Sequence, residues 1–179
     1  MTVDPDIDIG IESGDASWPK AEPLLRKVWP DDVRASPPWC DLVFAHAEFR
    51  VLVEREGYGL VCHVGIHRRQ ASLNGRPVHI GAIGEVVTHP DQLRRGYATL
   101  ALNAAIATLR HEGSIAFAAL FCKPHNEAFY RARGWHDFEG DVIAEQPGTN
   151  GCFAIMQPMV FDLVQRPRKG TLDLLGLPW

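Results

Sequence analysis

Hydrophobic and polar positions alternate along much of the first half of the chain, with the period of two that is typical of strands with one buried face. The alternation marks residues 4–11, 49–54 and 58–70, and a turn at 56–57 joins the last two. The pair Asn74–Gly75 favours a type I′ hairpin because both residues tolerate positive φ, and a further strand follows over 76–88. The first half therefore predicts several antiparallel strands.

The period changes to that of a helix in three places. Residues 16–29 read as a helix that Trp29–Pro30 ends, because the residue before a proline avoids helical geometry. Residues 97–109 carry an apolar stripe, and 126–133 form a short helix that ends at Gly134. The remaining segments are predicted as a loop or short helix at 31–39, a buried central strand at 115–122, a strand at 152–161 and an irregular tail to 179. This order predicts an α/β fold in one domain over residues 1–179.

The composition is that of an ordinary globular protein. Of 179 residues, 46% are apolar and 22% are charged, and the net charge of -4 gives no basic excess for binding nucleic acid. No apolar run approaches the roughly 18–20 residues that a membrane helix needs, and the amino terminus lacks the basic start of a signal peptide. We therefore expect a cytoplasmic protein without nucleic-acid or membrane partners.

The cysteines are scattered and form no CxxC pair, so we expect reduced, buried thiols, with no metal site and no disulfide framework. They are Cys40, Cys62, Cys122 and Cys152. A nucleophilic Cys122 would need a basic partner, and His125 lies three residues further on.

The segment 88–98 joins a strand to a helix and carries the strongest candidate chemistry. Backbone amides at a helix start are unpaired, and the helix dipole is positive there, so the segment can hold a phosphate. Gly96 and Ala98 let the backbone approach a phosphate closely, and Arg94 and Arg95 add positive charge. Taken alone, the segment is also compatible with an ordinary basic connection between two elements.

A second segment, Asn126–Glu127–Ala128–Phe129–Tyr130–Arg131–Ala132–Arg133–Gly134–Trp135, follows a buried strand about thirty residues later. Together the two segments resemble the GNAT N-acetyltransferase superfamily, over roughly residues 60–135. The resemblance implies a central mixed, mostly antiparallel sheet flanked by helices, and acetyl-CoA or another acyl-CoA as co-substrate. Carried over by position, the residues that would contact the cofactor are Val86, Val87, Thr88, Leu93, Arg94, Arg95, Gly96, Tyr97, Ala98, Thr99, Asn126 and Phe129. One departure is Leu93, where the superfamily usually has Arg or Gln; Gln92 lies one position earlier.

A finer resemblance is to aminoglycoside 2′-N-acetyltransferases and nodulation-factor N-acyltransferases. It rests on residues 61–69, the hairpin, residues 83–88 and the tail 170–179, which is acidic and ends in tryptophan. Both relatives acylate amines on sugars, so a small-molecule amine is the expected acceptor. The resemblance also implies that Asp173 and Trp179 contact the acceptor, and the negative net charge mildly favours a cationic one.

The resemblance implies that an amine attacks the thioester directly in a ternary complex. Tyr130 would stabilise or protonate the leaving thiolate, and the amides near Val86 and Val87 would hold the carbonyl oxygen. For the base, Glu85 competes with the terminal carboxylate of Trp179, and a water that a carboxylate orients is the third possibility. The corresponding glutamate of the aminoglycoside acetyltransferases aligns with Gly84, so Glu85 is one residue out of phase and points away from the acceptor unless a β-bulge restores the phase.

Other histidines and tryptophans carry simpler expectations. His63, within an apolar strand, is expected in the core, and His89 and His125 are expected to be exposed in loops. Trp18, Trp29 and Trp39 are expected in the core or over the acceptor side. The alternative function is an acyl-CoA-binding sensor of the same fold without catalysis, favoured by Leu93 and by the phase of Glu85. Acyl-chain length and a homodimer are left open.

Overall fold

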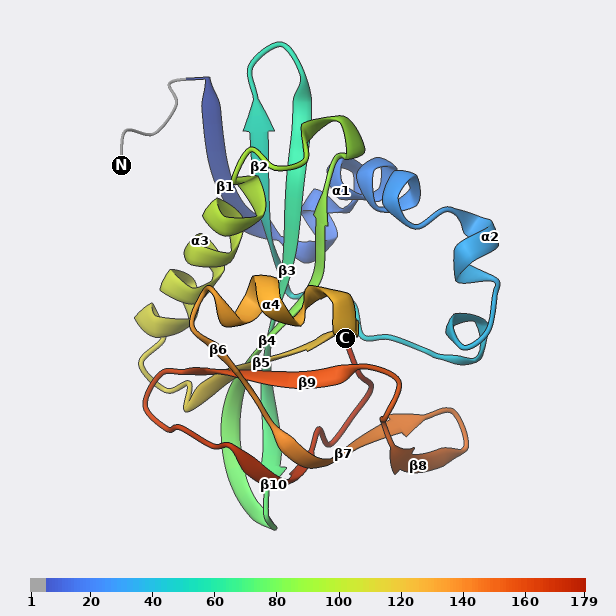
Figure 1. The fold of residues 1–179 in the computed structure, drawn as a ribbon, viewed down its shortest axis with the longest axis vertical. Helices are drawn as coiled ribbons and strands as arrows, with labels where there is room; N and C mark the ends of the chain where they lie inside the picture. Colours follow the sequence, from blue (N-terminus) through green and yellow to red (C-terminus); the bar gives the residue numbers. More distant parts are fainter. Residues whose placement is uncertain (1–5) are drawn as a thin grey trace.

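The computed structural model describes residues 6–179, and its centre is one sheet with strand order β6-β9-β5-β4-β3-β10-β7-β8, to which β2 and then β1 are added beside β3 (Figure 1). The strands are β1 Ile7–Ser13, β2 Phe49–Arg55, β3 Gly59–Leu73, β4 Arg76–Thr88, β5 Phe117–Cys122, β6 Trp135–Asp137, β7 Glu139–Gln146, β8 Thr149–Cys152, β9 Gln157–Asp162 and β10 Lys169–Asp173. The helices are α1 Gly14–Val28, α2 Asp31–Arg34, α3 Tyr97–His111 and α4 Glu127–Arg131, with 3₁₀ turns at Trp39–Asp41, Pro90–Gln92 and Pro124–Asn126.

The hairpin of β3 and β4 forms the middle of the sheet. Its turn is the predicted pair, with φ of 51° at Asn74 and 77° at Gly75. β3 is long enough to hold two neighbours on its other edge, because β2 pairs with Gly59–Ile66 and β10 pairs with Ser72 and Leu73. The predicted first strand at 4–11 corresponds to β1, and its residues 4 and 5 lie outside the described part of the chain.

β4 and β5 run parallel but pair over only part of their length. The paired residues run from Ile80 with Phe117 to Ile83 with Leu120. β4 continues to Thr88 and β5 to Cys122, so the two strands separate after Ile83. The last residues of β4 are therefore bonded to β3 on one edge only, which leaves backbone groups on the other edge available to a ligand.

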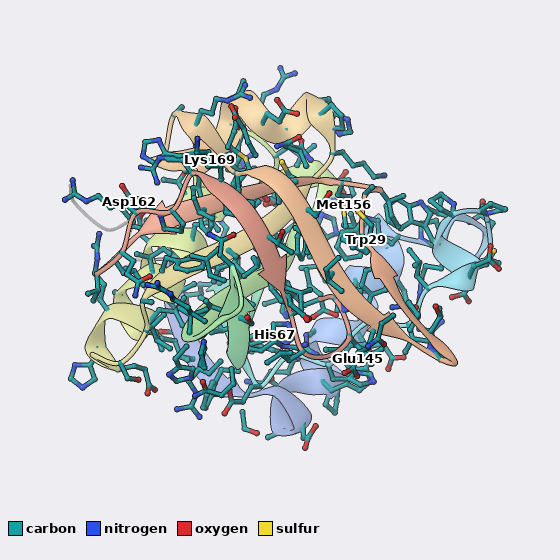
Figure 2. All side chains as sticks on the ribbon, turned by 90° about the horizontal axis from the view of Figure 1, so that it is seen from below. Trp29, His67, Glu145, Met156, Asp162 and Lys169 are labelled. Carbon is teal, nitrogen blue, oxygen red and sulfur yellow. The ribbon has the colours of Figure 1, made fainter. Side chains whose placement is uncertain are left out.

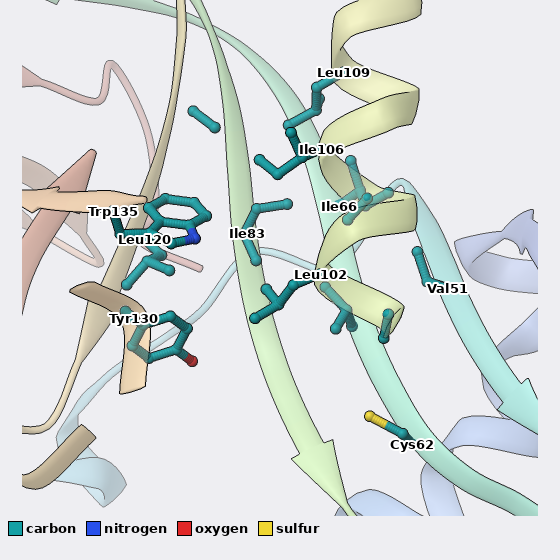
Figure 3. Close-up of a cluster of buried hydrophobic side chains, with 14 of the residues drawn as sticks. Val51, Cys62, Ile66, Ile83, Leu102, Ile106, Leu109, Leu120, Tyr130 and Trp135 are labelled. Carbon is teal, nitrogen blue, oxygen red and sulfur yellow. The ribbon is translucent and has the colours of Figure 1, made fainter. Parts of the chain in front are cut away.

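Helices α3 and α1 cover opposite faces of the sheet (Figure 1). Successive side chains of β2 alternate between them: Val51 and Val53 pack with α3, whereas Leu52 packs against Leu24 and Leu25 of α1. Figure 3 shows the cluster on the α3 side, which contains Ile66, Ile83, Leu102, Ile106, Leu109 and Leu120. α2 stands away from the sheet, and the segment 42–47, which has no regular structure, leads back to β2.

The carboxyl-terminal part of the chain is more regular than the sequence predicts. The tail contains β10, which pairs in parallel with β7 (Figure 2), and the predicted strand at 152–161 divides into β8 and β9. β10 has no alternating pattern, because Leu172 is its one buried residue. Its pairing depends on glycines that meet: a Cβ on Gly140 would lie 2.1 Å from the carbonyl oxygen of Gly170. No helix within residues 6–179 is long and apolar enough to cross a membrane.

Candidate active site

The turn between β4 and α3 is exposed, and two of its residues have positive φ. Gly96, directly before α3, has φ of 86°, and Arg94 has φ of 62°. The side chains of Arg94 and Arg95 have no ion-pair partner among residues 6–179, and Leu93 is 57% exposed. The predicted phosphate-binding turn therefore presents free cations and unpaired amides at the start of a fifteen-residue helix.

Two buried side chains support this turn from below. His89 Nδ1 accepts a hydrogen bond from the Asp91 amide at 3.2 Å and lies 3.0 Å from the Tyr58 hydroxyl, so the expectation that His89 is exposed was wrong. The buried Gln92 accepts from Arg55 Nη1 at 3.4 Å. Because Gln92 is buried, its side chain does not take the place of the Arg or Gln that the family usually has at the position of Leu93.

Arg133 connects the segment 126–135 to the start of α3. Its Nε donates to Thr99 Oγ1 at 2.8 Å, and its Nη1 donates to the Phe129 carbonyl at 2.6 Å. The guanidinium carbon lies 3.6 Å from the centroid of the Phe129 ring. Asn126 is exposed at the start of α4. Sequence reasoning did not single out Arg133, because an arginine near a helix end is an ordinary surface residue.

Tyr130 is buried on α4, and Figure 3 shows its hydroxyl end directed toward β4. Its ring makes edge-to-face contacts with Phe129 and Trp135. Burial, with Cys122 and Cys62 nearby, raises the pKa of Tyr130 above its usual range, so the phenol keeps its proton and can donate it in a hydrogen bond. Burial also raises the pKa of the Cys122 thiol to about 11, so this thiol, considered from the sequence as a nucleophile, keeps its proton at neutral pH.

The expectation of buried thiols holds for half of the cysteines. Cys62 and Cys122 are buried, whereas Cys40 and Cys152 are exposed, and all four are free. The first lies on the 3₁₀ turn after α2 and the last on the edge strand β8, where neighbouring elements do not cover them.

A β-bulge lies where β4 separates from β5. His63 pairs with Val87 and Gly65 pairs with Gly84, so two residues of β4 oppose one residue of β3. Glu85 takes φ of 50° within this bulge. Its Oε2 lies 3.3 Å from the position that a Cβ on Gly65 would occupy, so its side chain lies on the face that β3 turns toward α1. The bulge thus restores the phase that the sequence left open.

Four polar side chains form a row on this face, between the apolar cluster under α1 and the one under the tail. We call Arg50, His63, His67 and Glu85 the polar belt. Arg50 is 1% exposed, bonds to Glu85 Oε2, and lies 2.9 Å from His63 Nε2. It also donates to the Gly14 carbonyl at 3.3 Å, and its guanidinium carbon lies 5.0 Å from the centroid of the Trp18 ring.

The hydrogen bonds of His63 fix its tautomer. Arg50 can only donate, so His63 Nε2 accepts and Nδ1 carries the proton. Nδ1 therefore donates a hydrogen bond to the Glu85 carbonyl at 2.8 Å. Burial lowers the pKa of His63 to about 4, which keeps the ring neutral. His63 is thus a core residue, as predicted, and it holds the bulge. Arg50 was not predicted as a site residue, although a charge among the apolar residues 49–54 was the available signal.

Trp179, at the end of the tail, contacts β4 at Ile83 and Gly84, directly before the bulge. Its Nε1 donates to the Ile83 carbonyl at 3.1 Å, and its carbonyl carbon lies 3.4 Å from the position of a Cβ on Gly84. Arg69 holds the tail, since its Nη1 donates to the Leu177 carbonyl at 2.7 Å and its guanidinium carbon lies 5.5 Å from the Trp179 ring centroid. Both predicted base candidates therefore lie at the end of the β4–β5 pairing.

Asp173 is not brought to this place. It pairs with Ser72, seven residues beyond Gly65 along β3, which corresponds to roughly 20 Å of strand. Its Oδ1 accepts from the Leu175 amide at 3.0 Å, within a turn of the tail. Among residues 6–179 there is no group of three or more His, Cys, Asp or Glu that could hold a metal ion.

In this structure the parallel strands β4 and β5 separate beside an exposed, basic helix start. Residues 12–137 match the family described as the acetyltransferase (GNAT) domain, so the chain belongs to that family. No curated protein matches the sequence.

The fold is that of solved GNAT structures. It is similar to YhbS, a GNAT family N-acetyltransferase from Escherichia coli solved in complex with CoA, with 15% identity over 97% of this chain and 93% of that one and a TM-score of 0.61. Escherichia coli ElaA is 15% identical over 87% of this chain and 99% of that one, with a TM-score of 0.62. The fold is also similar to a GNAT family acetyltransferase from Brucella melitensis in complex with acetyl-CoA. The identity is 14% over 93% of this chain and 94% of that one, and the TM-score is 0.58.

Proposed function

We propose that this protein transfers an acetyl group from acetyl-CoA to a primary amine of a small molecule, by direct attack in a ternary complex. The observation that carries the proposal is the end of β4, where an unpartnered strand edge meets an exposed basic helix start. The transfer forms the amide C–N bond and breaks the thioester C–S bond, and the amine loses a proton while CoA leaves as the thiol. Membership of the GNAT acetyltransferase family supports this class of reaction.

The described residues fit acetyl-CoA, which supplies the thioester carbonyl when bound. The amides of 94–98, with Arg94 and Arg95, would hold its pyrophosphate, and Gly96 leaves no side chain in the way. The free edge of β4 at Val86 and Val87 would bind the arm and the carbonyl oxygen. Asn126 and Phe129, with Thr99 held through Arg133, would close the other side.

Tyr130 would stabilise the leaving thiolate. Its raised pKa makes full proton transfer to a thiolate of ordinary basicity unfavourable, so a hydrogen bond from the phenol is the larger contribution. The hydroxyl end of its ring is directed toward β4, where the reacting thioester would lie (Figure 3).

Two carboxylates can receive the proton of the amine. Glu85 Oε2 is bonded to Arg50, but Oε1 has no hydrogen-bond partner among the described residues and is the free oxygen. The rival is the carboxylate that ends residue Trp179 in this sequence, beside Gly84. An appended glycine separates the two, because it removes that carboxylate and leaves the Trp179 ring in place. If the extended chain keeps full activity, the terminal carboxylate of Trp179 is not the base.

The acceptor that we propose first is an amino sugar, given the resemblance of the hairpin and tail to enzymes that acylate sugar amines. The alternative is an acyl-CoA-binding sensor. One of its two supports was the phase of Glu85, and the bulge removes it. Leu93 remains its support.

The test is release of free CoA from acetyl-CoA in the presence of a panel of amino sugars and simple amines, with the acetylated product identified by mass. We expect turnover on at least one amine, and a fall of about 10²-fold in kcat for Tyr130→Phe with acetyl-CoA binding unchanged. Binding of acetyl-CoA without turnover on any amine would favour the sensor, whereas an unchanged kcat in Tyr130→Phe would contradict the role proposed for Tyr130.

A further inference from the structure

Nε2 of His67 is the one fully covered side-chain nitrogen or oxygen among residues 6–179 that has no hydrogen-bond partner. The residue is 5% exposed, and its Nε2 is fully covered. Buried polar atoms in native proteins nearly always have a partner, since an unpaired one costs free energy. The neighbouring His63 shows the contrast, because both of its ring nitrogens are bonded.

His67 lies next to the proposed reaction centre. It follows His63 and Gly65 on the same face of β3 and pairs with Ala82, two residues from the Gly65–Gly84 pair. Two residues of strand span about 7 Å. A hydroxyl oxygen five bonds away from the reacting nitrogen, as in 4-aminobutan-1-ol, would therefore reach His67 while the nitrogen lies near Gly84 and Glu85.

The surroundings of His67 disfavour positive charge. Burial lowers its pKa to about 4, and Arg69 and Arg50 lower it further than Glu48 raises it, so the imidazole is neutral at neutral pH. A neutral imidazole has one donor and one acceptor nitrogen. Arg69 would repel an ammonium group placed at this position more than Arg50 would, because the charge of Arg50 is paired with Glu85, whereas a hydroxyl group would meet no such repulsion.

One ring that lies against His67 comes from the tail and not from β3 or β4. The centroid of the Trp179 ring lies 6.1 Å from that of His67. The segment 42–47 is bonded to the tail through Ala45 N and the Pro178 carbonyl at 2.7 Å, and to β7 through the Gln146 side chain, which bonds both the amide and the carbonyl of Val43. The Trp179 ring is not part of the pairing of β3 with β4, so its displacement would leave that pairing intact.

We propose that His67 is a specificity-determining residue whose Nε2 hydrogen-bonds a hydroxyl group of the acceptor, which is therefore an amino alcohol or monoamino sugar and not a polyamine. The inference rests on the proposed function. It narrows the class of acceptor amines. The negative net charge of the whole chain favours any cationic amine, whereas the charges around His67 disfavour a second ammonium group there.

The test compares three matched amines: butylamine, aminobutanol and diaminobutane. For the wild type we expect kcat/KM for aminobutanol about tenfold above butylamine, through KM, with diaminobutane below butylamine. In His67→Leu the ratio of aminobutanol to butylamine should fall to near one, and His67→Gln, which keeps hydrogen-bonding groups, should retain part of it. The thermal midpoint of His67→Leu should stay level or rise, because an unpaired polar group is removed.

Binding of the same amines to the protein saturated with CoA, measured by calorimetry, keeps this inference separate from the proposed function. A binding preference for aminobutanol that disappears in His67→Leu supports the role of His67 even where turnover is absent, and absent turnover then counts against the proposed function alone. A preference for diaminobutane, an aminobutanol preference that survives in His67→Leu, or no binding of any of the three would overturn the inference.

Discussion

The proposed phosphate-binding turn, residues 93–98, and the polar belt both adjoin β4 and are built in opposite ways. The turn at 93–98 is exposed, consists mostly of backbone, and comes from one continuous segment. The polar belt is buried, consists of side chains, and joins residues of β2, β3 and β4. A pyrophosphate needs only amides and positive charge, whereas an acceptor is recognised by the groups that surround it.

The difference also separates stability from binding. Changes in the turn should alter acetyl-CoA affinity and leave the core intact, because its side chains contact little of the core. Changes in the polar belt should alter folding first, because Arg50 is buried with one carboxylate partner.

The largest expected effect is that of Glu85→Gln on stability. It leaves Arg50 buried and charged without a carboxylate, which costs about 3–5 kcal/mol in the free energy of unfolding measured with urea. The matched control is Glu48→Gln, whose partner Arg68 is at the surface, with an expected loss of about 1 kcal/mol or less. Adding Arg50→Met to Glu85→Gln should recover much of the loss. Equal losses in the two single variants would show that the buried pair is not special.

A smaller effect is expected from acid. The pKa values of His63 and His67 are lowered to about 4 in the folded protein, against 6.5 as the ordinary value. Below that ordinary value the unfolded chain binds protons that the folded one does not, so stability is lost as the pH falls from about 6.5 to about 4. Between pH 7 and pH 5 the loss is roughly 2 kcal/mol for each ring. Urea unfolding at both pH values measures it, and His67→Leu should remove about half. A dependence that His67→Leu leaves unchanged would show that His67 does not titrate this way.

The two ends of α3 allow a matched test of the turn. Gly96 and Gly113 both have positive φ, 86° and 66°, with open space where a Cβ would lie. A valine at either position should cost about 1–2 kcal/mol in stability. Only Gly96→Val should weaken acetyl-CoA binding, by about tenfold, as measured by calorimetry. If Gly113→Val weakens binding equally, the effect is one of stability and not of the turn.

The smallest expected effect is a gain. Leu93→Arg places a cation beside the helix start and should tighten acetyl-CoA binding about two- to fivefold at low salt, an advantage that salt reduces. Val164→Arg adds the same charge at a residue that is 74% exposed and outside the turn. An equal gain in both variants would point to net charge alone.

The same contrast explains what the sequence could predict. Gly96, Arg94 and Arg95 are neighbours in the chain, so their chemistry can be read as a motif, and the hairpin at Asn74 follows from local φ preferences. The bulge at Glu85 depends on the pairing of β4 with β3, and pairing across a sheet is not local. The contact of Arg50 with Glu85 spans 35 positions, and the strand character of β10 comes from its neighbours. Such features need the tertiary structure.

Hydrogen–deuterium exchange with and without acetyl-CoA tests the central claim most directly, namely that the backbone at the end of β4 and the start of α3 binds the cofactor. We expect new protection at the amides of 86–88 and 93–99, with no change in β1, which lies at the far edge of the sheet. Protection confined to other segments, or saturable binding that leaves the amides of 93–99 unprotected, would contradict the account.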